Sequence, residues 1–256
     1  MLDIADLYHF YTTPLGRSVA ALLQQRVRAV WPELPNQRVC GFGYAVPLLD
    51  LYPGSAALMP AAQGVMAWPR GNAPRALLVD EYRWPLADSS IDALILMHAL
   101  EHAEQTRRLL REAWRVLRGD GRLLVIVPNR LSIWARREVS PFGYGKPYTL
   151  MQVKTLLQQS MLTPLQHRTA LLWPPCRQET LLKAAPYADA FLGGIASGLG
   201  GALIVEAGKQ VYAPTFHSGT AVRIKGTVPV MKPALSPDAQ RLKPLECLSG
   251  IAKLVC

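Results

Sequence analysis

Hydrophobic positions recur with helical spacing in two parts of the chain. In the stretch PLGRSVAALLQQRVRAV, residues 14–30, apolar side chains return every three or four positions, and Pro14 stands in the first turn, where a helix tolerates it. The stretch LMQVKTLLQQS, residues 150–160, shows the same spacing. Both patterns predict amphipathic helices, and Trp31-Pro32 ends the first one.

Short apolar runs elsewhere predict buried strands. They cover residues 38–42, 55–60, 75–79, 91–97 and 123–127, with 64–68 as a continuation of the second run, and later 166–173 and 201–212. An arginine-rich amphipathic helix is expected between 97 and 123. Strands that alternate with helices indicate an α/β fold with a mostly parallel sheet. Right-handed crossovers then place a ligand crevice at the carboxyl ends of the strands.

The regular pattern ends at residue 214. From there on prolines break any long element, and basic residues outnumber acidic ones; the breaks are Pro214, Pro229, Pro233, Pro237 and Pro244. We therefore expect one domain over residues 1–213 and a basic tail over 214–256 that is extended or partly disordered.

Composition narrows the class of protein. Half of the residues are hydrophobic, which is ample for a buried core. The four cysteines lack metal-ligand spacing and indicate a reducing cytoplasm without a zinc site: Cys40, Cys176, Cys247 and Cys256. The N-terminus lacks the order of a signal peptide, and the longest uncharged run, 190–205, is shorter than the ~20 residues of a membrane span. The net charge of +10 permits acidic partners such as nucleic acid or anionic lipid, and the oligomeric state stays open.

The segment from Asp80 to Asn129 carries a series of short motifs in a fixed order. An acid is followed by Trp-Pro-Leu, Ser-Ile-Asp, His-Ala-Leu-Glu-His, a stretch from Arg115 to Gly121 and an apolar strand. This order closely resembles the second half of a class I S-adenosylmethionine-dependent methyltransferase of the small-molecule, type 11-like branch. The resemblance implies a Rossmann-like fold: a mostly parallel seven-stranded sheet with an antiparallel last strand and helices on both faces. It also implies S-adenosylmethionine as cofactor.

The family's glycine-rich turn after the first strand has only a degenerate counterpart. The chain offers Val39-Cys40-Gly41-Phe42-Gly43-Tyr44-Ala45-Val46-Pro47, in which Gly43 and Ala45 match two glycines and Pro47 replaces the third. In this alignment, and also in one shifted by two residues, the family's acidic residue is missing. The resemblance places Gly41, Gly43, Tyr44 and Ala45 against the cofactor, and a tight turn without a ligand is the alternative.

The second strand also departs from the family. Where a relative has a carboxylate for the ribose hydroxyls, this strand ends in Leu58-Met59-Pro60, which leaves Met59 beside the cofactor. A charge-assisted hydrogen bond of that kind contributes roughly 1.5–3 kcal/mol. Gln63 could accept a weaker hydrogen bond from one ribose hydroxyl, or backbone atoms could hold the ribose.

Four further residues follow from the resemblance. Asp80 occupies the place of the acid that receives the adenine amino group, with Glu81 beside it and Trp84 available to pack on the adenine. A solvated strand end is the other interpretation of Asp80-Glu81. His98 either lines the methionine end of the pocket or acts as a general base, while Glu101-His102 cap the following helix. His98 and His102 would share one helical face, but a metal site is not expected because a third ligand is missing.

The acceptor is expected to be a small molecule. The resemblance places the loop 140–149 over it, as an aromatic cover or as an ordinary loop packed inward, and the N-terminal aromatic cluster beside it; the named residues are Tyr11, Phe142, Tyr144, Lys146 and Tyr148. No Asn/Asp-Pro-Pro-Tyr motif follows residues 91–97, which disfavours N-methylation of bases and leaves O- or C-methylation. The alternatives are an inactive methyltransferase fold that serves as a binding partner and, less favoured, an RNA methyltransferase.

Overall fold

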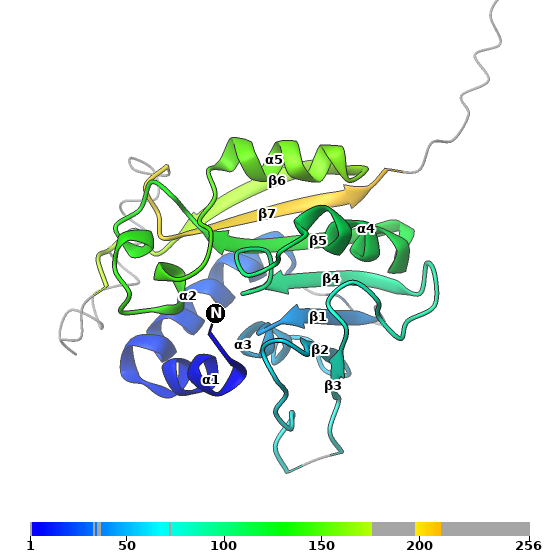
Figure 1. The fold of residues 1–256 in the computed structure, drawn as a ribbon, viewed down its shortest axis with the longest axis horizontal. Coiled ribbons are helices and arrows are strands. Elements are labelled where there is room, and N and C mark those ends of the chain that lie inside the picture. The colour runs from blue at the N-terminus through cyan, green and yellow to red at the C-terminus, as the bar shows by residue number, and fades with distance from the viewer. Residues whose placement is uncertain (1, 33, 35–36, 72, 176–197, 211–256) are drawn as a thin grey trace, which may run out of the picture. The chain divides into compact units, whose positions relative to one another are not determined.

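The computed structural model describes residues 2–32, 34, 37–71, 73–175 and 198–210. Seven strands form one sheet in the order β3-β2-β1-β4-β5-β7-β6 (Figure 1). Their bounds are β1 Val39–Gly43, β2 Ala56–Pro60, β3 Ala76–Val79, β4 Ile91–Met97, β5 Leu117–Pro128, β6 Leu162–Ala170 and β7 Ala202–Lys209. Only β7 runs antiparallel to its neighbours β5 and β6. The expected Rossmann-like sheet is confirmed.

The strands follow the apolar runs closely, with one correction. β4 has the bounds expected of it, whereas β5 begins at Leu117 and β6 ends at Ala170. The strand expected over 64–68 is wrong, because β2 stops at Pro60 and the chain turns there. The Gln63 amide donates to the Pro60 carbonyl, and Gly64 has a φ of 89°, which a glycine adopts without strain.

The N-terminal helices cover one face of the sheet. Helix α1, Ile4–Thr12, was not expected, and α2, Pro14–Val30, has the expected bounds. Thr13 caps α2 by accepting from the Gly16 amide. A Cβ on Gly16 would lie 1.9 Å from the Phe10 carbonyl oxygen, so glycine lets the two helices cross closely. The short α3, Val46–Leu49, completes this layer.

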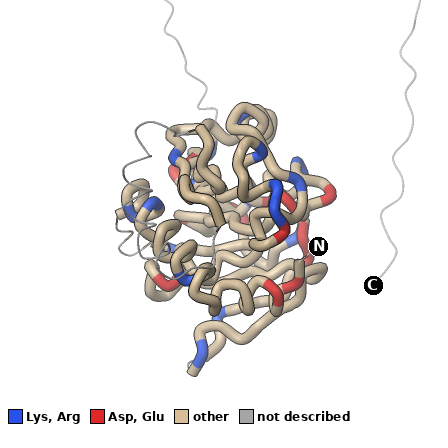
Figure 2. Tube along the Cα trace, turned by 90° about the vertical axis from the view of Figure 1, so that its left-hand side faces the viewer, with Lys and Arg blue, Asp and Glu red and all other residues tan. Residues whose placement is uncertain are grey.

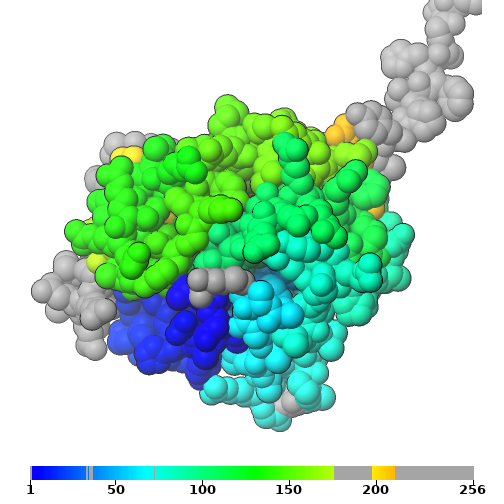
Figure 3. All heavy atoms as spheres, in the orientation of Figure 1, coloured from blue at the N-terminus to red at the C-terminus, as the bar shows by residue number. Residues whose placement is uncertain are grey.

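The other face carries α4, Thr106–Val116, and α5, Leu150–Gln159. Each face has its own hydrophobic cluster, one under α1 to α3 and one under α4 and α5. The connection from β5 to α5 includes two 3-10 turns, η1 at Trp134–Arg136 and η2 at Pro141–Gly143. In the space-filling view the N-terminal helices, the β1–β3 region and this connection meet on one surface (Figure 3). The tail expected over 214–256 lies outside the described residues.

Candidate active site

A buried hydrogen-bond chain stands at the carboxyl end of β4. The Nε2 atom of His98 lies 2.8 Å from the Tyr11 hydroxyl, and its Nδ1 atom lies 3.0 Å from Glu101 Oε1. The His98 and Glu101 side chains are both almost fully buried. His98 has a φ of 52°, a left-handed conformation that costs a non-glycine residue about 1–3 kcal/mol and is concentrated at functional sites.

The direction of this chain follows from its partners. Glu101 as a carboxylate can only accept, so Nδ1–H donates a hydrogen bond to it and the lone pair of Nε2 faces Tyr11. Burial raises the pKa of the Tyr11 phenol well above its usual value, so the hydroxyl keeps its proton and donates. Glu101 Oε2 is buried and has no hydrogen-bond partner among the described residues.

Aromatic rings pack around His98, and the Tyr11 ring lies tilted against it with centroids 5.9 Å apart. Tyr44, the residue after β1, stacks on Tyr11 with ring centroids 5.5 Å apart. Phe142 of η2 meets the imidazole edge-on at 5.0 Å. Four residues predicted from separate parts of the sequence therefore lie together: Tyr11, Tyr44, His98 and Phe142.

The glycine turn after β1 is shaped by its contact with β4. Gly43 has a φ of 82°, and a Cβ there would lie 2.3 Å from the Met97 carbonyl oxygen. The Tyr44 amide donates to that same oxygen at 2.8 Å. Gly41 instead makes room for Ala45, whose Cβ would lie 2.6 Å from a Cβ on Gly41. Both glycines are thus required by packing, and their contact with a cofactor stays a prediction.

Gln63 reaches across the sheet from the end of β2. Its Nε2 donates to the His98 carbonyl oxygen at 2.9 Å, and β1 lies between β2 and β4, so the amide passes over the end of β1. The side chain is buried, and Oε1 has no partner in the described part of the chain. Met59 is fully buried in the core below and accepts from the Met66 amide.

The residues predicted around adenine lie apart from His98. Asp80 is exposed, and its Oδ1 accepts from the Tyr82 amide at 2.8 Å. Burial raises the pKa of Glu81, although a hydrogen bond with Tyr82 opposes this. Trp84 stacks on Phe42 with centroids 4.7 Å apart and belongs to the core under α4. Its role in an adenine pocket stays a prediction.

The connection after β5 is tied to the turn that holds Glu101. The Lys146 amide donates to the Glu101 carbonyl, and the Tyr148 hydroxyl donates to the Leu100 carbonyl. Burial raises the pKa of Tyr148 to about 12, so this donor persists at neutral pH. The Lys146 side chain is exposed, and the Tyr144 hydroxyl bonds back to the Glu138 carbonyl. The part of this segment that touches His98 is Phe142.

Two expectations for the His98–His102 segment are wrong. Residues 98–103 form turns rather than a helix, so the two histidines share no helical face. Helix α4 begins at Thr106, and its N-cap residue is Gln105, which makes no side-chain cap. The Glu101 side chain points inward and bonds to His98, so it does not cap helix α4. Burial lowers the pKa of His102, whose Nε2 has no partner among the described residues.

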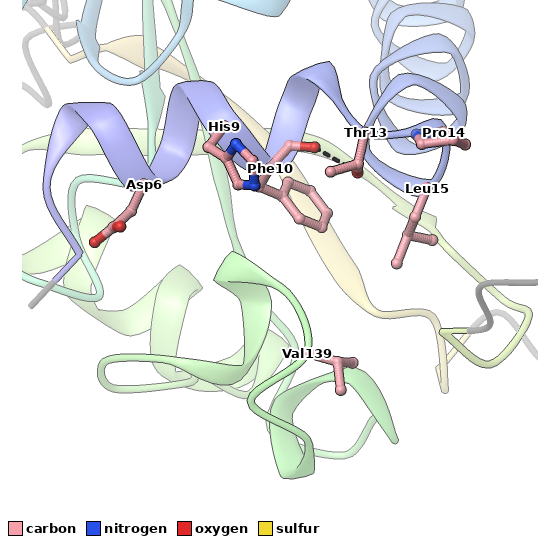
Figure 4. Close-up of a pocket in the computed structure, with 7 residues that line it drawn as sticks. All are labelled: Asp6, His9, Phe10, Thr13, Pro14, Leu15 and Val139. Carbon is pink, nitrogen blue, oxygen red and sulfur yellow. Dashed lines mark hydrogen bonds between the residues drawn. The ribbon is translucent and has the colours of Figure 1, made fainter.

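The sequence does not predict a cavity of about 470 Å³, because its pattern predicts no helix over residues 4–12. One side of α1 and the start of α2 face the segment around Val139 across it (Figure 4). The lining is Asp6, His9, Phe10, Thr13, Pro14, Leu15 and Val139. The spacing of Asp6, Phe10 and Thr13 is the signal that could have revealed this shared helical side. A second cavity of about 290 Å³ lies by Tyr11 and Tyr44.

Two kinds of feature are absent from the described residues. They contain no group of three or more metal-ligating side chains that could hold an ion. They also contain no helix that is long and apolar enough to cross a membrane.

Comparison with known proteins identifies the fold family. A family described as "Methyltransferase domain" matches residues 39–125, which run from β1 into β5. These residues match the family, and the chain as described has the fold of a class I methyltransferase. Solved methyltransferase structures share the fold: one from Thermotoga maritima has a TM-score of 0.55 and 16% identity over 81% of this chain and 96% of its own. One from Archaeoglobus fulgidus has a TM-score of 0.52 and 16% identity over 74% and 94%.

Curated relatives match the methyltransferase domain over a limited length. A protein of Mycobacterium tuberculosis, named a probable S-adenosylmethionine-dependent methyltransferase, is 31% identical over 107 residues, or 40% of this chain and 39% of the relative. The uncharacterized protein YafS of Escherichia coli is 38% identical over 87 residues, or 34% and 36%. The chain thus spans less than two fifths of the length of each of these relatives.

Proposed function

We propose that this chain is an S-adenosylmethionine-dependent methyltransferase that acts on a small-molecule acceptor, with transfer to oxygen or carbon favoured over nitrogen of a base. The observation that carries the proposal is the Tyr11–His98–Glu101 hydrogen-bond chain. It stands at the carboxyl end of β4 and next to the turn after β1, where open α/β sheets bind their ligands. The scattered cysteines favour a cytoplasmic location.

The residues at this edge of the sheet fit the cofactor. Gln63 Oε1 is a buried acceptor without a partner in the described chain, as expected of an atom that awaits a hydroxyl donor. Gly43, Tyr44 and Gln63 would hold the cofactor, and Asp80 would accept a hydrogen bond from the adenine amino group. When bound, the cofactor supplies an electrophilic methyl group on a sulfonium. Glu101, which is buried beside His98, would as a carboxylate favour such a positive charge.

His98 would accept the proton of the acceptor. Its Nε2 lone pair faces the Tyr11 hydroxyl, so an acceptor hydroxyl that replaces Tyr11 would donate to the same atom. Glu101 would hold the ring in this tautomer and stabilise the imidazolium that forms. Phe142 and Tyr44 would exclude water and orient the acceptor, because direct transfer depends on positioning.

The alternative is a methyltransferase fold without catalysis, favoured by the lack of a carboxylate between Asp50 and Asp80. Calorimetric titration of the full chain with S-adenosylmethionine and S-adenosylhomocysteine separates the two. Micromolar binding that is lost in Asp80→Ala and kept in Asp120→Ala, an exposed acid in β5, supports the enzyme. Absence of heat and of a thermal shift at millimolar ligand would leave the binding-partner alternative.

A further inference from the structure

The connection between β5 and α5 exposes large aliphatic side chains. Leu131 is 56% exposed, Ile133 is 52% exposed and Val139 is 42% exposed. Ser132 and Trp134, which alternate with them, are buried. An exposed leucine alone needs no explanation, but three exposed aliphatic residues within one short connection make this connection a candidate interaction site.

This connection is anchored rather than loosely attached. The Ser132 hydroxyl donates to the Asn129 carbonyl at 2.7 Å, and the Trp134 indole donates to the Trp173 carbonyl at 2.7 Å. Trp134 also packs edge-on against Phe142. Leu131 and Ile133 are therefore held outward by their buried neighbours, and their exposure is built into the local fold.

Cations accompany the aliphatic residues. The segment 130–149 contains Arg130, Arg136, Arg137 and Lys146 but a single carboxylate, Glu138. All of these are exposed. Neither Arg136 nor Arg137 forms a salt bridge with another described residue, so their charge is available to an anionic partner.

The same connection borders an open cavity. Val139 lines the 470 Å³ cavity opposite Phe10 and Leu15, so its walls include apolar side chains from three segments (Figure 4). The rings of Phe10 and Tyr11 meet edge-on with centroids 5.0 Å apart. The Tyr11 hydroxyl in turn bonds to His98. Helix α1 thus contributes Phe10 to the cavity and Tyr11 to the hydrogen bond with the buried His98.

We propose that the segment 130–139, here called the docking loop, seats the protein on an anionic lipid bilayer. Leu131 and Ile133 would enter the headgroup region while Arg136 and Arg137 meet lipid phosphates, a combination of apolar contact and charge typical of surface-bound proteins. The inference rests on the proposed function in one respect, because it makes the acceptor an amphiphile drawn from that membrane. Docking itself needs no membrane-spanning helix.

Nucleic acid fits this surface less well. Base stacking requires aromatic side chains beside the cations, whereas the exposed partners of these arginines are aliphatic. The lysines and arginines of the described chain also lie in separate places on the face shown in Figure 2, rather than in one continuous stripe.

The test is co-sedimentation of the full chain with vesicles of phosphatidylcholine alone and of phosphatidylcholine with phosphatidylglycerol. We expect binding to the anionic vesicles and little to the neutral ones. The double variant Arg136→Gln/Arg137→Gln should bind about 25-fold more weakly, since each arginine near the surface contributes about fivefold. Leu131→Ser/Ile133→Ser should also weaken binding. Matched controls are Arg107→Gln/Arg108→Gln on α4 and Leu165→Ser on β6, all exposed, which should bind as the wild type does.

Three outcomes would overturn the proposal: equal binding to both vesicle types, wild-type binding by both docking-loop variants, or salt-sensitive binding of RNA that depends on the arginines but not on Leu131 and Ile133. Titration of the same variants with S-adenosylhomocysteine keeps the two proposals apart. Docking-loop variants should bind it as the wild type does, so a failed vesicle test leaves the proposed activity standing. Failure of the wild type to bind it would count against the activity and not against docking.

Discussion

At the scale of single residues, His98 is the position on which the proposed chemistry depends. Nε2 lies against the Tyr11 hydroxyl and Nδ1 against Glu101. If His98 is the proposed base, His98→Gln should lower kcat by about 10²- to 10⁴-fold, the range of general-base catalysis. Cofactor affinity measured by calorimetry should stay within a few-fold of the wild type. His167→Gln, on the exposed part of β6, is the control and should keep full activity. Equal loss in both variants would contradict a base at His98.

The proposed contact of Gln63 with the ribose can be tested by comparing a ligand that has a ribose with one that lacks it. Gln63→Leu keeps the volume but removes the unpartnered Oε1, so affinity for S-adenosylhomocysteine should fall about fivefold, or about 1 kcal/mol. Affinity for methionine, which has no ribose, should not change. A parallel loss for both ligands would mean that Gln63 acts only through its bond to the His98 carbonyl.

At the scale of elements, the crossing of α1 and α2 places Tyr11 at the site. Gly16→Ala puts a methyl group into the Phe10 carbonyl, and we expect a loss of about 1–3 kcal/mol in the free energy of unfolding, measured with urea. Gly198→Ala is the matched control, because a Cβ there meets nothing within 4 Å and should leave stability within about 0.5 kcal/mol. Similar stability of the two variants would show that the crossing tolerates separation.

The sequence identified the elements whose pattern is local. Apolar runs gave β4 residue for residue, and helical spacing gave α2, because each buries a regular set of side chains. Helix α1 was missed because only Ile4, Leu7 and Tyr11 are buried, and the intervening aromatics obscure their spacing. The Tyr11–His98 contact joins residues 87 positions apart, and no local pattern encodes such a pair. Gln63 was noticed, but its bond across β1 depends on the strand order.

At the scale of the whole molecule, ionic contacts that support the sheet lie at the end opposite the site. Asp92, at the start of β4, pairs with Arg38 before β1 and with Arg118 in β5. Burial alone would raise the pKa of this carboxyl, but the hydrogen bonds from Arg38 and the charges of both arginines outweigh burial and lower it. A lowered folded-state pKa means that the stabilisation is complete above the usual value of 3.8 and is lost as the pH falls through the lowered one.

Asp92→Asn should therefore make the domain less stable at neutral pH by about 1 kcal/mol, because both arginine partners are about half exposed and solvent screens the pairs. The difference from the wild type should vanish as the pH falls through the lowered pKa of Asp92, below which both proteins lack the charge. Urea denaturation at a series of pH values measures this, with Asp120→Asn, whose carboxylate is 88% exposed, as the control. Cofactor affinity should be unchanged in both variants, since Asp92 stands at the end of β4 remote from His98. A difference in stability that persists at low pH would mean that Asp92 acts through packing rather than through its charge.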